Sequence, residues 1–437
     1  MIAKLSKVLS PEEVIRIAKE ENFIKRDSKI DAMKFLKMLF FDHLQNDQPS
    51  LQQHACGIYD DHNVKVSKQA IDKRFNDQAV EFIKKLFENF LNHSLDRELM
   101  PSDLDKIFSA IRIMDSTEFK LPASLAKEFP GYSGDGTASC AAIQFEYDVM
   151  NRQIKCMSLE NARVSDKTYA DKRMEDIQPK ELIIRDLGYY SIDSYKKIED
   201  QKAFYISRLK AQIAIYDKTD KGYLQLNWPA IIALIKKSKE KCFDKTVYIG
   251  TTDKKPVRLM AWLLDEAAQA KRLKQKKNRK GKLNETDEIW SQLNVFITNI
   301  AFKKITPQQA YNLYKIRWQI ELIFKIWKSI LKINLIRKMK ANRFRCYVYS
   351  KLLWVLLSWD ISTGFEPIIW KENKRLISMY KCYGLLKTKV AQLKDILFNN
   401  HEKLKEWMCK MFRCFIDFGL KENRKKRKNL EELLQVK

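Results

Sequence analysis

The spacing of hydrophobic and polar positions changes along the chain. In residues 1–105 apolar residues recur every three or four positions, as over 30–45, which predicts helices. From residue 106, short apolar runs at 107–114, 139–148, 153–160, 181–184 and 203–209 predict strands, and 191–201 predicts a helix. Residues 211–300 are less regular, with β-like runs at 247–250, 257–263 and 295–298, and helical spacing returns from residue 306. Strands interleaved with helices indicate an α/β layer architecture.

Residues 50–75 have the pattern of two short helices joined by a turn. Ser50 and Ser67 are each placed to cap a helix, as Ser10 is before Pro11. The outer face of the second helix carries donors of the kind that read the major groove of DNA, namely Lys68, Gln69, Lys73 and Arg74. This pattern predicts a helix–turn–helix unit, with a helical hairpin that has a basic outer face as the alternative.

One amphipathic helix is predicted from Thr306-Pro307 onward. At 100° per residue, four polar side chains fall within about 60° of one another on its surface: Tyr314, Arg317, Glu321 and Lys328. The opposite side is apolar, with Ile316, Ile320, Ile323, Trp327 and Ile330. Trp318 and Phe324 flank the polar row, which predicts that the row is partly covered. Ordinary charge pairing on a surface helix is the alternative interpretation.

Charge points to a polyanionic partner. The 437 residues contain 82 Lys and Arg against 55 Asp and Glu, a formal net charge of +27. This excess favours nucleic acid first and an anionic membrane second. Residues 271–282 hold eight basic side chains and no acid, as expected of a segment that follows a phosphate backbone. A hydrophobic content of 45% excludes a disordered chain.

Two other classes of protein are disfavoured. His54, Cys56 and His62 lie close in sequence but lack a nearby fourth ligand, so a zinc site is not expected there. The most apolar stretch, residues 346–358, is interrupted by Lys351 and falls short of the ~20 residues that a membrane span requires. We therefore interpret it as a buried helix and expect no membrane partner.

The polar row matches a known signature. Tyr314-x2-Arg317-x3-Glu321-x6-Lys328 resembles the YREK motif of bacterial insertion-sequence DDE transposases of the insertion-sequence four family. The segments that begin at Asp115-Ser-Thr and Asp186-Leu-Gly-Tyr are similar to those around the family's first and second catalytic Asp, and residues 290–299 also fit. The resemblance covers roughly residues 105–360.

The resemblance implies a ribonuclease H-like α/β core, formed by residues 106–210 and 301–360 and interrupted by a β-rich insertion at 211–300. A helical DNA-binding domain would occupy residues 1–105, and a helical C-terminal region, 361–437, would support dimerisation. The two Asp are 186 − 115 = 71 residues apart, which leaves room for two strands. The interval to the Glu is 321 − 186 = 135 residues, and an insertion accounts for its excess length.

The resemblance also implies roles for individual residues. Asp115, Asp186 and Glu321 would be catalytic and would bind two Mg²⁺ ions, with Mn²⁺ as an alternative, because three converging carboxylates repel one another without cations. Tyr314, Arg317 and Lys328 would contact DNA phosphates. Trp290, with Trp262 as the alternative, would stack on a flipped base, although a core role for Trp290 is equally compatible with its context. Asp166, after Arg163-Val-Ser, is similar to a family motif, with a helix-cap residue as the alternative interpretation.

The expected function is cut-and-paste transposition. A homodimer would bind the terminal inverted repeats of an insertion sequence, cleave double-stranded DNA and join the ends to target DNA, in the bacterial cytoplasm and associated with the nucleoid. One rival is a regulatory or inactivated DNA-binding protein of the same fold. A second rival is a ribonuclease H-like nuclease without strand transfer.

Overall fold

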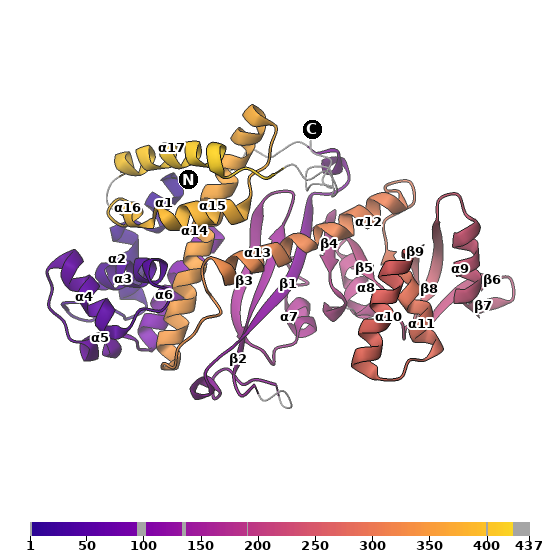
Figure 1. Ribbon diagram of the computed structural model, residues 1–437, viewed down its shortest axis with the longest axis horizontal. Coiled ribbons are helices and arrows are strands. Elements are labelled where there is room, and N and C mark those ends of the chain that lie inside the picture. Colours follow the sequence, from indigo (N-terminus) through magenta and orange to yellow (C-terminus); the bar gives the residue numbers. More distant parts are fainter. Residues whose placement is uncertain (1, 94–101, 133–136, 190, 399–400, 423–437) are drawn as a thin grey trace.

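The computed structural model describes residues 2–93, 102–132, 137–189, 191–398 and 401–422. Figure 1 shows a central sheet with the N-terminal helices at one end and the segment around β6–β9 at the other. The N-terminal helices are α1 (Ile2–Val8), α2 (Pro11–Glu20), α3 (Ala32–Gln45), α4 (Leu51–His62), α5 (Lys68–Arg74) and α6 (Asp77–Asn92). The hydroxyls of Ser10, Ser50 and Ser67 accept backbone N–H bonds three residues on, so all three predicted caps are confirmed.

Five strands form the first half of the sheet, in the order β3-β2-β1-β4-β5. β1, β2 and β3 are antiparallel, whereas β4 and β5 run parallel to β1. This is the ribonuclease H-like arrangement, and it confirms the predicted α/β fold class. The elements are η1 (Asp103–Lys106), β1 (Ala110–Lys120), η2 (Ala123–Leu125), β2 (Cys140–Asp148), β3 (Gln153–Asn161), α7 (Asp166–Lys172), β4 (Glu181–Arg185), η3 (Leu187–Tyr189), α8 (Ile192–Asp200) and β5 (Phe204–Arg208).

The irregular segment after β5 extends this sheet. β10 pairs antiparallel with β5, and β9, β8, β6 and β7 follow in that order, which gives ten strands in the described residues. The runs predicted at 247–250, 257–263 and 295–298 fall mainly within β8, β9 and β10. The segment also contains three helices. Its elements are β6 (Ile215–Thr219), β7 (Gly222–Gln225), α9 (Trp228–Lys237), β8 (Cys242–Ile249), β9 (Lys255–Leu263), α10 (Glu266–Lys280), α11 (Glu285–Gln292) and β10 (Leu293–Thr298).

The predicted single helix after Thr306 is two helices, α12 (Pro307–Ile316) and α13 (Trp318–Ser329), which meet at Arg317. The backbone tightens there, because Arg317 N–H donates to the Tyr314 carbonyl and Ile320 N–H to the Arg317 carbonyl, each over three residues at 3.1 Å. The predicted apolar side of this segment is buried, since Ile316, Ile320 and Trp327 are fully buried, which confirms the prediction for these residues. All four side chains of the polar row are half-buried, so the prediction that the row is partly covered is confirmed. Of the two flanking residues Phe324 is buried, whereas Trp318 is 54% exposed.

The C-terminal part is helical, with α14 (Ala341–Asn373), α15 (Met379–Thr388), α16 (Val390–Lys394) and α17 (His401–Phe418). By length and composition α14 is able to cross a membrane, but 78% of its most apolar window is buried inside the protein. It packs against α6, α3 and α15. α14 is therefore a core helix, as interpreted from the sequence.

Lys351 of α14 predicts a pH dependence of stability. Its side chain is buried, its Nζ donates to the Lys332 carbonyl at 2.9 Å, and burial lowers its pKa from 10.5 to about 8. The unfolded chain therefore binds this proton more tightly, and this contribution to stability rises with pH between about 8 and 10.5, by roughly 3 kcal/mol. Urea unfolding of wild type and Lys351→Met at several pH values measures how the free energy of unfolding depends on pH. The same pH dependence in both chains would contradict this prediction.

Candidate active site

Strand alternation brings two acids to one face of the sheet. Ile111 and Ile113 of β1, like Leu182 and Ile184 of β4, belong to the hydrophobic cluster that includes α13. Asp115 and Asp186 continue this alternation, so they emerge on the same face. Parallel pairing of Met114 with Arg185 makes the two acids neighbours across adjacent strands.

The sequence predicted that this strand ends just before Asp115, but Asp115 lies within β1. β1 continues to Lys120 because its antiparallel pairing with β2 extends to Cys140, and Asp115 pairs with Phe145 within this stretch. β4 ends at Arg185, one residue before Asp186. Asp115 therefore lies where the β1–β4 pairing stops but the β1–β2 pairing goes on, which leaves room for its side chain beside α13.

Arg317 holds the acidic residues together. Its guanidinium donates to Asp115 Oδ2 at 3.3 Å and to Glu321 Oε1 at 2.8 Å. Tyr314 Oη donates to Asp186 Oδ1 at 3.4 Å. The structure thus brings together all three predicted catalytic carboxylates and two members of the polar row, around a half-buried cation between α12 and α13.

The charges perturb one another. Burial first, and then the charges of Asp186 and Asp166, raise the pKa of Asp115 to about 6, against the hydrogen bond from the Ser116 N–H and the charge of Arg317, which lower it. Burial and the charge of Asp186 raise the pKa of Tyr314 to about 12. Burial would lower the pKa of Arg317, but its anionic neighbours, Asp186 first, raise it. The site has more negative charge than one arginine neutralises.

Lys328, the last member of the polar row, lies beside the same acids. It lines an open groove with Asp115, Thr117, Glu321 and Phe324. Its Nζ donates to the Glu118 carbonyl on β1 at 3.1 Å, and burial lowers its pKa. The groove has acids on its floor and a cation at its side, an arrangement suited to a phosphodiester.

Asp166 is a neighbour that the sequence interpretation undervalued. Ser165 caps α7, whereas Asp166 Oδ1 accepts from the Gln144 amide on β2 at 3.2 Å. A Cβ on Gly188 would lie 3.3 Å from Asp166 Oδ2, so a larger residue in the Asp186-Leu-Gly-Tyr turn would press on this carboxylate. The resemblance around Arg163-Val-Ser was the available signal, but sequence alone does not reveal that Asp166 lies close enough to Asp115 to raise its pKa.

The predicted N-terminal DNA contacts lie elsewhere. Lys68, Gln69 and Lys73 are exposed on α5, at the opposite end of the molecule from α11 (Figure 1). Arg74 does not join them, because its guanidinium stacks 3.8 Å from the Phe23 ring centroid and donates to the Phe23 carbonyl. Ala55, Ile58, Ile71 and Phe75 are buried where the two helices meet the core.

Neither candidate tryptophan contacts the acids. Trp290 is half-buried and packs edge-on against Trp228, with ring centroids 5.1 Å apart, in the hydrophobic cluster of the 211–300 segment. The ring centroids of Trp262 and Phe296 are 5.7 Å apart, and those of Phe296 and Tyr314 are 4.8 Å apart. Of the two, Trp262 is therefore connected through packed rings to the polar row.

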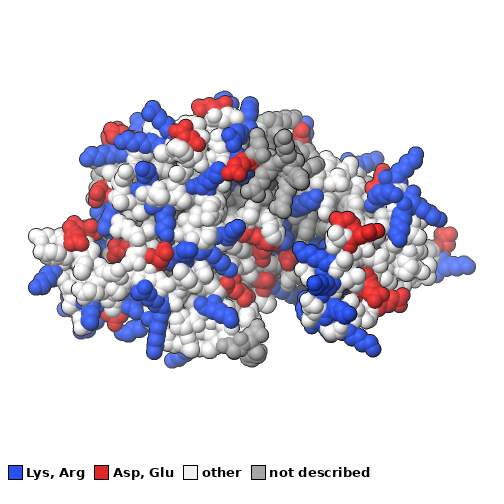
Figure 2. Space-filling view, viewed as in Figure 1, with Lys and Arg blue, Asp and Glu red and all other residues white. Residues whose placement is uncertain are grey.

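Several bases of the 271–282 run have structural contacts. Arg272 donates to Leu293 and Asn294 of β10, and Lys276 and Lys280 pair with Asp287 of α11. The remaining bases, including Lys271, are exposed on or next to α10. Figure 2 shows Lys and Arg spread over this face of the molecule rather than confined to one stripe.

The sheet order and the three facing carboxylates define a ribonuclease H-like protein with an acidic site. Residues 107–357 match the family described as Transposase DDE domain. The chain is 30% identical to the transposase for insertion sequence element IS1151 of Clostridium perfringens, over 97% of this chain and 93% of that protein. It is 27% identical to the transposase for insertion sequence element IS231E of Bacillus thuringiensis subsp. finitimus, over 99% and 94%.

A solved structure is also similar, the cryo-EM structure of the piggyBac transposase synaptic complex with hairpin DNA. Its TM-score is 0.48, its sequence identity 10%, and the match covers 98% of this chain and 87% of that one. The chain belongs to the Transposase DDE domain family, and is a transposase enzyme of the insertion-sequence type.

A DDE domain implies divalent metal ions. The donor set fits such an ion, because three carboxylates supply only oxygen ligands. Burial and neighbouring acids raise the pKa of Asp115, and a divalent cation would favour its ionised form. Within the described residues, no three His, Cys, Asp or Glu side chains are close enough to hold a metal as they stand. Arg317, bound to both Asp115 and Glu321, is the cation at this position.

Proposed function

We propose that this transposase binds the terminal inverted repeats of an insertion sequence, cleaves them in a metal-dependent reaction and joins the ends to target DNA. The observation that carries the proposal is the meeting of Asp115, Asp186 and Glu321 around Arg317, beside an open groove that Lys328 lines. Acids alone would repel DNA, so their position among phosphate-binding cations favours chemistry on a phosphodiester over simple binding.

Asp115, Asp186 and Glu321 would hold two Mg²⁺ ions, or Mn²⁺ in their place. When bound, the ions supply charge that activates the attacking oxygen and stabilises the leaving one. Tyr314, Arg317 and Lys328 would hold phosphates of the terminal nucleotides and keep the DNA end in register. Trp290 or Trp262 would stack on a displaced base, and the contacts around Phe296 favour Trp262.

The remaining regions would organise the DNA. Residues 1–105 would bind the repeat through Lys68, Gln69 and Lys73 of α5, and residues 211–300 would follow the phosphate backbone with the exposed bases near α10. Residues 361–437, of which 423–437 lie outside the described part, would support a homodimer that bridges two ends. The protein would act in the bacterial cytoplasm, at the nucleoid.

A direct test uses the purified chain, Mg²⁺ and linear DNA that carries the inverted repeats flanking the gene. The proposal predicts cleavage at the repeat ends only with metal, followed by joining to a target plasmid. Specific binding without cleavage would favour the regulatory rival. Cleavage without joining would favour the nuclease rival.

Arg317 gives a prediction with a readout other than catalysis. Arg317→Ala removes the cation that competes with a metal ion for Asp115 and Glu321. The DNA-free variant should therefore bind Mn²⁺ about tenfold more tightly, because close unscreened like charges repel each other by more than about 1 kcal/mol. Titration calorimetry measures this affinity. Cleavage should nevertheless fall, because a phosphate contact is lost. The exposed Lys325 of the same groove supplies the matched control, Lys325→Ala, with unchanged Mn²⁺ affinity. Equal or weaker Mn²⁺ binding by Arg317→Ala would overturn this account of Arg317.

A further inference from the structure

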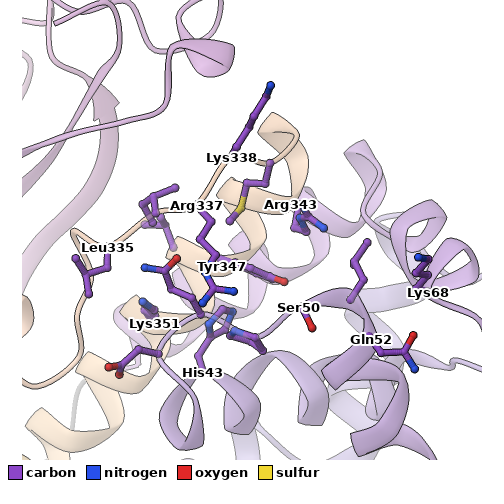
Figure 3. A pocket seen from close by; sticks show the side chains of 17 residues that line it. His43, Ser50, Gln52, Lys68, Leu335, Arg337, Lys338, Arg343, Tyr347 and Lys351 are labelled. Carbon is purple, nitrogen blue, oxygen red and sulfur yellow. The ribbon is translucent and has the colours of Figure 1, made fainter.

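A second pocket lies far from the acids, where the N-terminal helices meet the segment between α13 and α14. Its volume is about 370 Å³. The walls come from three parts of the chain: the end of α3 with the start of α4, the first residue of α5, and residues 335–351. Figure 3 shows Arg337 reaching into the pocket toward His43 and Tyr347, while Lys338 points away from it.

The lining of this pocket is strongly cationic. It contains five basic residues, Lys68, Arg337, Lys338, Arg343 and Lys351. Of these, Lys338 points away from the cavity and Arg343 pairs with Asp72 at 3.9 Å. The lining holds one acid, Asp47, and Lys387 already pairs with it at 2.9 Å. Such an excess of positive charge around a cavity attracts an anion and disfavours a neutral or cationic ligand.

Polar groups inside the pocket lack normal partners. His43 is 3% exposed, and neither of its ring nitrogens makes a hydrogen bond of normal geometry in the described part of the chain, although the ring interacts with the backbone of Asp47. Gln48 Oε1 and Arg343 Nε are also buried without a hydrogen-bond partner in the described part of the chain. Buried polar groups are rarely left unpaired, so these groups indicate a site that a polar ligand completes.

The start of α4 adds to the same preference, although the C-terminal end of α3, near His43, lines the same pocket with the opposite partial charge. Ser50, the N-cap of α4, lines the pocket, and α4 is a helix of 12 residues whose positive end therefore faces the cavity. Lys68 is the first residue of α5 and is exposed. The pocket thus opens beside the helix to which we assign DNA contacts.

We propose that this pocket binds a phosphate group, and that its source is the backbone of the DNA end. The assignment to DNA rests on the function proposed above. Residues 330–340 join α13, which carries Glu321, to α14. A phosphate held by Arg337 inside the pocket, on DNA that continues toward Lys68 at the other side of the pocket, would therefore connect the recognition helices to the catalytic helix through the DNA. Residues 335–343 belong to neither the N-terminal region nor the polar row, and this pocket adds them to the surface that binds the DNA end.

The test measures affinity for the terminal-repeat DNA at several salt concentrations, with ethylation of individual phosphates as a second readout. Arg337→Gln and Lys68→Gln should each weaken binding about tenfold and reduce the slope of log affinity against log salt by about one. Ethylation of one particular phosphate should inhibit wild type but not Arg337→Gln. Arg413→Gln, at an exposed arginine of α17, is the charge-matched control and should change nothing.

The outcomes separate this inference from the proposed function. If wild type binds and cleaves the repeats but Arg337→Gln has the same affinity and salt slope, the inference is wrong and the proposed function stands. If wild type binds no repeat, the proposed function fails, and inorganic phosphate is the remaining probe. Phosphate that raises the unfolding temperature of wild type but not of Arg337→Gln would then support an anion site and overturn its assignment to DNA. An equal effect on both chains would overturn the site itself.

Discussion

Replacing Asp115 with Asn will abolish metal-dependent cleavage of the repeat ends without destabilising the chain. Asn has the same shape but cannot carry the negative charge that a divalent ion requires, so the cleavage rate should fall by at least about 10³-fold. Stability at pH 7 should be unchanged or higher. Burial and two neighbouring acids raise the pKa of Asp115 to about 6, so above that pH the ionised carboxylate lowers the stability of the metal-free folded state relative to the unfolded chain, in which this carboxyl ionises at lower pH.

Single-turnover cleavage, repeat binding and thermal unfolding, measured on the same preparation, check this result. Glu118→Gln is the matched control, because Glu118 lies on the same strand but is exposed and accepts from the Tyr132 hydroxyl. Its rate should stay within about threefold of wild type. Asp186→Asn and Glu321→Gln should be as damaging as Asp115→Asn, and pairs of these changes should not multiply their effects. Residual cleavage by Asp115→Asn above a tenth of wild type would remove Asp115 from the catalytic set.

The sequence predicted the sheet well because its central strands are buried on both faces and contain runs of apolar residues. All nine residues of β2 are buried, and so are all five of β4, so both stand out as continuous runs without any knowledge of their partners. The end of β1 was missed for the opposite reason. Its second half, from Asp115, alternates exposed and buried residues, and its extension depends on pairing with β2, which the local pattern does not contain.

The candidate site was predictable as a set of residues but not as an arrangement. The spacing of Tyr314, Arg317 and Glu321 survives the break between α12 and α13, because Arg317 keeps right-handed helical angles, φ −49° and ψ −34°. The position of Arg317 between two acids depends on the distance from α13 to β1, which is a tertiary property. Arg74 and Trp318 show the same limit, since a stacking partner at Phe23 and an uncovered helix face are not encoded locally.

A buried ion cluster on the other face of β1 carries the largest expected effect on stability. Arg112 is 2% exposed and donates to both carboxylate oxygens of Glu146, at 2.7 and 3.1 Å. It also donates to Glu181 at 2.6 Å and to the Asp176 carbonyl at 3.0 Å. β1 thus carries the cation that neutralises acids on β2 and β4, its two neighbours in the sheet.

Arg112→Met should lower the free energy of unfolding by about 3–5 kcal/mol. Methionine fills similar space, but it leaves Glu146 and Glu181 as buried carboxylates without the cation that hydrogen-bonds to both, and the remaining nearby charge is that of Arg185, which interacts with Glu146. Arg16→Met is the matched control. Arg16 also bridges two carboxylates, Glu13 and Glu20, but its side chain is 53% exposed, so the loss should stay below about 1 kcal/mol. Urea unfolding of the three proteins at pH 7 gives both differences.

The triple change of Arg112, Glu146 and Glu181 to Met, Leu and Leu separates two causes of that loss. If unpaired buried charge is responsible, removing the acids as well should recover most of the stability, because a well-packed apolar cluster often replaces a buried ion cluster at little cost. If the triple variant is as unstable as Arg112→Met alone, the loss comes from packing around β1, and the ion cluster does not hold the sheet together. Since Asp115 lies on this same strand, cleavage by the triple variant also reports whether β1 keeps its catalytic carboxylate in place.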